Sequence, residues 1–162
     1  MRATSSERSR QRGFTMAELI VVIVIIGILA VVAGPKIQGM LGAQDDAWHD
    51  QAVAALRQAQ KTAVASRRLV CAVVVSGSVT LSIAAANPAS ACTSAVTGLD
   101  GSSNSARTSS TAATSVSPQA TLYFQPSGQV STDGGGAAVS NFSVTIATEA
   151  TISVVGATGY VR

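Results

Sequence analysis

The sequence contains few of the side chains from which catalytic sites are built. Its 162 residues include one histidine, only 4% are aromatic, and 12% are charged, about half of the usual charged share. No Gly-x-Ser-x-Gly, phosphate-binding loop or Cys-x-x-Cys pattern is present. The sole histidine, His49, has only Asp46 and Asp50 as helix neighbours and no nucleophile beside it. These absences predict a surface histidine, no enzymatic activity and no cofactor.

Metal-binding patterns are scarce as well. The chain has two cysteines, Cys71 and Cys92, and together with the distant His49 they lack the spacing of a zinc site. The stretch Asp100-Gly-Ser-Ser-Asn104 has a faint similarity to a calcium loop, but it lacks the carboxylate count and the closing glutamate. We therefore expect no metal site.

The basic character of the chain is confined to its first 13 residues. The net charge is +3 and the sequence pI is about 9.3, which would suit a nucleic-acid partner. Beyond Gly13, however, seven cations face seven anions. The other four cations precede Gly13 and are accompanied there by a single anion, Glu7 (Arg2, Arg8, Arg10 and Arg12). A general nucleic-acid-binding surface is therefore not indicated by composition.

One long hydrophobic run is present, from Phe14 to Ala33, with Glu18 as its one charged residue. A helix of this length spans roughly 30 Å, the hydrocarbon thickness of a bilayer, and predicts a membrane helix over residues 14–34. Arginines precede the run, and three aspartates follow it. The positive-inside rule therefore predicts a cytoplasmic N-terminus, with everything after Gly34 outside. No small-x-small site follows the run, so a cleavable secretory signal fits poorly.

Glu18 conflicts with such a segment, because a carboxylate within a membrane helix costs up to about 3 kcal/mol near the bilayer centre and normally has a partner. Arg12 lies too far back along a helix to be that partner. One interpretation is that Glu18 reaches the lipid headgroups by itself. The other is that its partner comes from another molecule.

The stretch Arg12-Gly13-Phe14-Thr15-Met16-Ala17-Glu18-Leu19 resembles the processing site of type IV prepilins and pseudopilins, apart from Met16, where the family usually has leucine. The resemblance implies that a prepilin peptidase cuts between Gly13 and Phe14 and methylates the new amine of Phe14. It also implies that residues 1–13 are a cytoplasmic leader peptide. Glu18 would then face the N-terminal amine of a neighbouring subunit during assembly on an inner-membrane platform.

The resemblance also implies an α+β type IV pilin fold, with a long N-terminal helix on a C-terminal antiparallel β-sheet. Gly34 and Pro35 follow the apolar run, and we expect them to kink or loosen the helix there. The family commonly has a proline in this region. A single-pass inner-membrane precursor, later part of an extracellular pilus or a periplasmic pseudopilus, is the expected location.

Beyond Pro35 the pattern becomes amphipathic. Residues 35–68 predict a helix, with Arg67 and Arg68 at its C-terminal end. A packed stripe recurs at spacings of three and four, with Ile37 and Leu41 continuing it upstream (Trp48, Ala52, Ala55, Ala59 and Ala63).

Residues 69–162 read as a β-rich head. Hairpins are predicted at 69–75 with 79–84 and at 120–125 with 129–131, and alternating strands at 141–147 and 151–156. Residues 85–118 are almost wholly small and polar, and they predict a long mobile loop. Residues 133–136 predict a shorter flexible link.

The two cysteines lie in the part of the chain that is expected outside the cytoplasm. In an oxidising space Cys71 and Cys92 can pair and close a loop of about 20 residues. Such a bridge would tie the predicted 85–118 loop to the first strand.

A finer resemblance links Leu122–Gly128 and the terminal Thr158–Arg162 to FimT/GspH-like minor pilins and to mannose-sensitive haemagglutinin pilins. Some FimT-type pilins bind DNA through a terminal Gly-Arg-x-Arg. Here Tyr160 replaces the first arginine and leaves only Arg162, so we expect little DNA binding. Three roles stay open: a pilus or pseudopilus subunit that polymerises with itself or with other pilins, a minor tip pilin that engages DNA or a surface, and a type II secretion minor pseudopilin.

Overall fold

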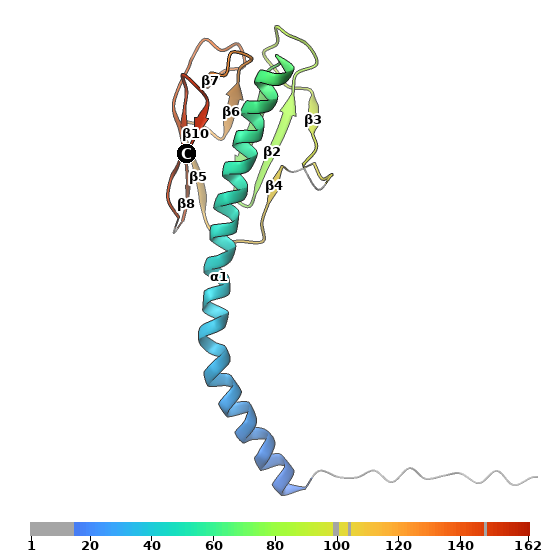
Figure 1. Ribbon diagram of the computed structural model, residues 1–162, viewed down its shortest axis with the longest axis vertical. Coiled ribbons are helices and arrows are strands. Elements are labelled where there is room, and N and C mark those ends of the chain that lie inside the picture. The colour runs from blue at the N-terminus through green and yellow to red at the C-terminus, as the bar shows by residue number, and fades with distance from the viewer. Residues whose placement is uncertain (1–14, 99–100, 104, 148) are drawn as a thin grey trace, which may run out of the picture. The chain divides into compact units, whose positions relative to one another are not determined.

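The computed structural model describes residues 15–98, 101–103, 105–147 and 149–162, and within these the side chains of all except residues 31–42. The chain divides into two compact units, residues 1–39 and residues 40–162. One helix, α1 (Met16–Ser66), contributes to both units, and all the described strands belong to the second unit, which we call the head (Figure 1).

The strands of the head form two sheets, and every described strand pair is antiparallel. The first sheet has the order β3-β2-β1-β6-β7, with β4 also paired to β2: β3 (Ser94–Val96), β2 (Ser78–Ile83), β1 (Val70–Val75), β6 (Thr121–Phe124), β7 (Val130–Ser131) and β4 (Ala106–Arg107). The second has the order β10-β9-β8-β5: β10 (Tyr160–Val161), β9 (Ile152–Val155), β8 (Phe142–Ile146) and β5 (Thr114–Ser117). An α+β architecture with a helix on antiparallel sheets is confirmed.

The predicted packed stripe of the helix is confirmed, since all five of its described members are at most 2% exposed (Trp48, Ala52, Ala55, Ala59 and Ala63). Leu56 is also fully buried. It was not among the residues predicted for the stripe, although it lies four residues after Ala52 on the same face. Alanine on this face lets the helix backbone approach the sheets closely. The stripe shares one hydrophobic core with both sheets, including Leu122 and Phe124 of β6 and Ile146 and Ile152 of the second sheet.

Two expectations about the strands were wrong. A single sheet was expected, but the described strands form two, and the chain passes from one sheet to the other after β4, after β5 and after β7. At the end of β5, Pro118 has no N–H to continue the ladder. Residues 85–118 were expected to lack regular structure, yet they contain β3, β4 and β5. Backbone pairing with β2 and β8 needs no apolar side chains, and the few apolar residues of this stretch, such as Ala106 and Val116, still reach the core.

The helix ends at Ser66, two residues before the predicted end, and the backbone closes it. Arg67 has a φ of 53°, and the N–H groups of Arg67 and Arg68 donate to the carbonyls of Val64 and Ala63 at 3.4 and 3.2 Å. This is the Schellman pattern, in which glycine is the usual residue at the left-handed position. The arginines therefore follow the last turn instead of lying within it.

The predicted flexible link at residues 133–136 is held by its own aspartate. Asp133 accepts hydrogen bonds from the backbone N–H groups of Ala137 and Ala138 at 3.2 and 2.7 Å. The Ala138 bond is the largest influence on this carboxyl, and the Ala137, Gly136 and Gly135 amides add to it, so the pKa of Asp133 lies below its ordinary value despite partial desolvation. Composition alone could not predict these hydrogen bonds, because the partners of Asp133 are backbone groups.

Candidate functional site

The N-terminal part of α1 that the structure describes, residues 16–30, presents an exposed apolar surface. Residues 15–30 are all exposed, and the large apolar side chains from Met16 to Leu29 expose between 41% and 82% of their area. Gly27 has open space around it. An apolar helix of this kind requires a lipid or protein environment on every side.

Among the described residues, no helical stretch combines the length and the apolarity needed to cross a membrane. Phe14 and the side chains of residues 31–34 belong to the predicted 14–34 segment and lie outside the described residues.

Thr15 caps the start of the helix. Its Oγ1 accepts a hydrogen bond from the backbone N–H of Glu18 at 3.2 Å, and its carbonyl accepts one from the N–H of Leu19 at 3.2 Å. Thr15-x-x-Glu18 has the spacing of a capping box, in which the glutamate supports the helix start. Glu18 thus lies in the first turn, where the helix dipole favours a negative charge.

The structure gives less for the residues of the predicted cleavage site and of the predicted helix kink. Gly13 and Phe14 lie outside the described residues. At Gly34 and Pro35 the structure gives backbone only, with helix from Met16 to Ser66, and the predicted kink stays a prediction.

A disulfide joins Cys71 to Cys92. Cys71 lies on β1 between Val70 and Ala72, which face the main core, and alternation along the strand turns Cys71 to the opposite face of the sheet. There it forms a small second cluster with Leu69 and Ala84, against which Cys92 packs. The bridge fastens the segment before β3 to this outer face.

We predict that a Cys71→Ala/Cys92→Ala chain unfolds with about 3 kcal/mol less stability than the parent chain, because the crosslink constrains the unfolded state. Urea denaturation of the full chain in detergent micelles measures this. A reducing agent should lower the midpoint of the parent chain and leave the variant unchanged. Equal midpoints for the two oxidised proteins would show that the bridge contributes nothing.

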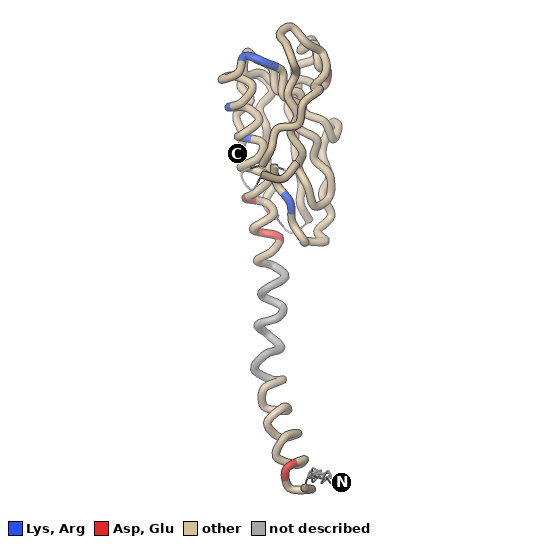
Figure 2. The backbone as a smooth tube through the Cα atoms, turned by 90° about the vertical axis from the view of Figure 1, so that its right-hand side faces the viewer, with Lys and Arg blue, Asp and Glu red and all other residues tan. Residues whose placement is uncertain are grey.

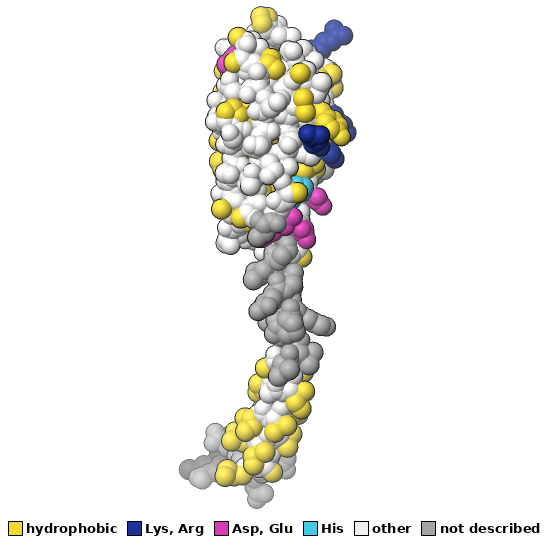
Figure 3. All heavy atoms as spheres, turned by 90° about the vertical axis from the view of Figure 1, so that its left-hand side faces the viewer, with side chains coloured by type: hydrophobic (Ala, Val, Ile, Leu, Met, Phe, Trp, Pro, Cys, Tyr) yellow, Lys and Arg dark blue, Asp and Glu magenta, His cyan; other side chains and the backbone are white. Residues whose placement is uncertain are grey.

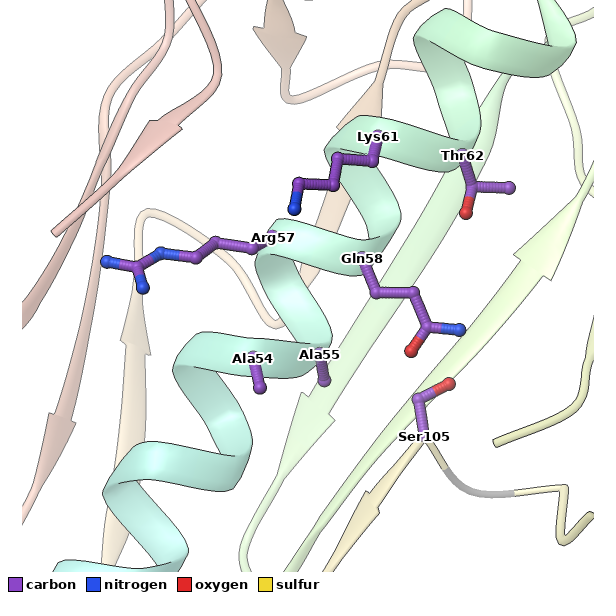
Figure 4. Close-up of a pocket in the computed structure, with 7 residues that line it drawn as sticks. All are labelled: Ala54, Ala55, Arg57, Gln58, Lys61, Thr62 and Ser105. Atoms are coloured by element: carbon purple, nitrogen blue, oxygen red, sulfur yellow. The ribbon is translucent and has the colours of Figure 1, made fainter. Parts of the chain in front are cut away.

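A groove of about 440 Å³ follows α1 (Ala54, Ala55, Arg57, Gln58, Lys61, Thr62 and Ser105). Figure 4 shows Gln58 directed toward Ser105, with Arg57 and Lys61 extending to the other side of the helix. The Oγ of Ser105 is buried and has no hydrogen-bond partner among the described residues. The lining offers cations, an amide and hydroxyls, and no carboxylate or imidazole.

Arg57 fixes the C-terminus to the helix. Its Nε and Nη2 donate to the carbonyl of Val161 at 3.3 and 3.1 Å, and Gln60 donates to the carbonyl of Thr158 at 2.8 Å. Arg162 pairs through its backbone with Ser153 and lines a second groove of about 270 Å³ with polar neighbours that include Asn141. The tail thus offers one guanidinium to a ligand.

Acidic side chains gather near Trp48. The pKa of Glu149 lies above its ordinary value, first because the carboxyl is partly desolvated and then because Asp46 is close to it, with a smaller contribution from Asp45. The opposing influence is His49, whose Nδ1 lies 3.5 Å from the exposed carboxylate of Asp50. Within the described part of the chain, no group of three potential ligands is arranged for a metal ion.

Glu149→Gln is predicted to raise the stability of the head at neutral pH. An acid with a raised folded-state pKa favours folding below its ordinary pKa of 4.5 and loses that contribution as the pH rises through its folded value. The amide removes the charge that Asp46 repels. Thermal midpoints should therefore separate at pH 7 and converge near pH 4, and a variant that is less stable at pH 7 would contradict this account.

Comparison with known proteins identifies the N-terminal segment. A family model described as the prokaryotic N-terminal methylation motif matches residues 8–34. Gly13, Phe14 and Glu18 all lie within the match, so the predicted prepilin-type motif is confirmed. This family of motifs marks structural subunits, and it implies processing by a prepilin peptidase and assembly with other pilins in general. No curated protein and no solved structure matches the chain.

Proposed function

We propose that this chain is a structural subunit of a type IV pilus or a pseudopilus, cut after Gly13 and polymerised through its N-terminal helix. The observation that carries the proposal is the exposed apolar segment 15–30, which begins at the Thr15 cap and carries Glu18 in its first turn. The methylation motif covers the same residues.

The apolar surface explains both stages of such a life cycle. Full burial of a valine, leucine or isoleucine side chain is worth about 1.5–3 kcal/mol, and about half of this remains available to the exposed apolar side chains of residues 19–29. Lipid can cover them in the precursor, with the leader in the cytoplasm and the head outside. Neighbouring helices can replace the lipid in a filament.

Glu18 gives the assembly its register. Cleavage before Phe14 would leave one residue ahead of the cap and create an amine that the uncut chain lacks. That amine would lie at the positive end of its own helix dipole, which disfavours it. A carboxylate from a neighbouring helix would compensate it in a medium of low dielectric constant, and the pair would form only at the correct axial offset.

The disulfide supports an extracytoplasmic head, because such bonds persist in oxidising compartments. It therefore agrees with the orientation that the charge distribution predicts for the precursor.

A second candidate is a tip subunit that engages DNA or a surface through Gly159–Arg162, and the polar groove beside Arg162 favours it. A chain that forms filaments as the sole pilin of a cell would support the first role. A chain that enters filaments only with other pilins would support the tip role or that of a type II secretion minor pseudopilin.

The first test is the intact mass of the protein extracted from its own membranes. We expect a chain that starts at Phe14, with one added methyl group and two hydrogens fewer because of the Cys71–Cys92 bond. An uncleaved mass, in cells whose peptidase processes another prepilin, would contradict the proposal because Glu18 would have no amine to meet.

A further inference from the structure

Four exposed charged residues form one line along the head part of α1. Asp46, Asp50, Arg57 and Lys61 are spaced by four, seven and four residues, and at about 100° per residue they fall within about 60° of the helix circumference. We call this line the charged stripe. It lies opposite the buried face of Trp48 and Ala59 and is exposed, although Arg57 also reaches the carbonyl of Val161 and Asp46 lies close to Glu149.

The charges of the stripe are segregated by sign. Figures 2 and 3 show acidic residues at the beginning of the head helix and basic residues further along it. Asp46 and Asp50 are four residues apart, as are Arg57 and Lys61, and like charges at this spacing destabilise an isolated helix. The crowding of Glu149 against Asp46 adds to the repulsion at the acidic end.

The chain does not neutralise the basic half of the stripe by itself. Arg57 donates to a neutral carbonyl, and in the described part of the chain neither Arg57 nor Lys61 makes an ion pair with a carboxylate. Asp50 and Arg57, the closest pair across the two halves, are seven residues apart, which is about 10 Å along a helix, and they form no ion pair in the described part of the chain.

We propose that the charged stripe is a contact surface between the heads of neighbouring copies of this chain other than the two that Glu18 joins, an inference that rests on the proposed function. A parallel copy displaced by eleven residues sets Asp46 opposite Arg57 and Asp50 opposite Lys61, and both pairs match at one offset because each half repeats at four residues. Val64, 48% exposed and on the same line, adds an apolar contact. The two surfaces differ, so the contact repeats from copy to copy and builds a filament.

Cysteine crosslinking of the full chain in its own membranes tests the geometry. We expect Asp50→Cys/Lys61→Cys to give a ladder of dimers, trimers and longer products with a short bismaleimide, because each copy then has a partner on both sides. Each single variant can give no product larger than a dimer. The matched control, Asp50→Cys/Thr145→Cys, places the second thiol at an exposed position of β8, on the face of the sheet turned away from the core, and should give no ladder.

Charge reversal tests the complementarity. Asp50→Lys and Lys61→Glu should each reduce the filament yield about fivefold, because an attraction becomes a repulsion. The double variant, with both charges exchanged, should recover the parental yield.

Three results would overturn the inference. Cleavage at Gly13, measured by mass in the same cells, distinguishes a failure of the stripe contact from a failure of the proposed function. A parent chain that is cleaved and forms filaments, with no ladder and no effect of reversal, would remove the stripe contact and leave the pilin role intact. Retention on DNA that Lys61→Glu abolishes, without a ladder, would assign the basic half to nucleic acid. An unprocessed, unassembled parent chain would remove both proposals.

Discussion

Glu18→Gln is expected to leave the chain fully cleaved and methylated yet reduce the filament yield at least about tenfold. The amide retains the size and hydrogen-bonding groups of the side chain and loses only the charge. A protonated amine at Phe14 would then be buried without its counter-charge, and removing one partner of a buried pair costs about 3–5 kcal/mol. Sheared filaments and intact mass, measured on the same cells, give the two readouts.

The control for this variant separates pairing from capping. Thr15 is uncharged, and its Oγ1 accepts a hydrogen bond from the backbone N–H of Glu18. Thr15→Ala therefore removes the helix cap and keeps the carboxylate. Loss of a cap costs about 1 kcal/mol of helix stability, and we expect Thr15→Ala to lower filament yield far less than Glu18→Gln does. Equal losses in the two variants would mean that Glu18 acts by supporting the helix start.

Trp48→Ala should destabilise the head by about 3–5 kcal/mol, the range for truncating a fully buried aromatic side chain. Trp48 has no exposed area, and its Nε1 donates to Thr114 Oγ1 at 3.1 Å, so it joins α1 to β5 of the second sheet. Urea unfolding of the full chain in micelles, followed by protease susceptibility, measures the loss.

Trp48→Phe provides the matched comparison, since it retains most of the buried area and removes the indole hydrogen bond. We expect it to cost about 1 kcal/mol for the bond plus a smaller packing loss. If Trp48→Ala lost less unfolding free energy than Trp48→Phe, this result would contradict the position of Trp48 in the core.

The local features of the chain could be predicted from sequence because each depends on residues close together in it. The methylation motif is one continuous stretch, and the packed stripe from Trp48 to Ala63 follows the helical repeat. The β1–β2 and β6–β7 hairpins connect strands through short turns, and their pairing was found as predicted.

The split into two sheets, the pairing of β3, β4 and β5, and the crowding of Glu149 against Asp46 were decided only by the tertiary structure. In each case the partners are far apart in sequence: β5 meets β8, and Glu149 meets a residue of α1. Backbone groups pair without regard to side-chain polarity, so residues 85–118 could form strands that their composition conceals. Composition and periodicity describe what a segment can bury, and the pairing partner that is available in space determines whether a polar segment becomes ordered.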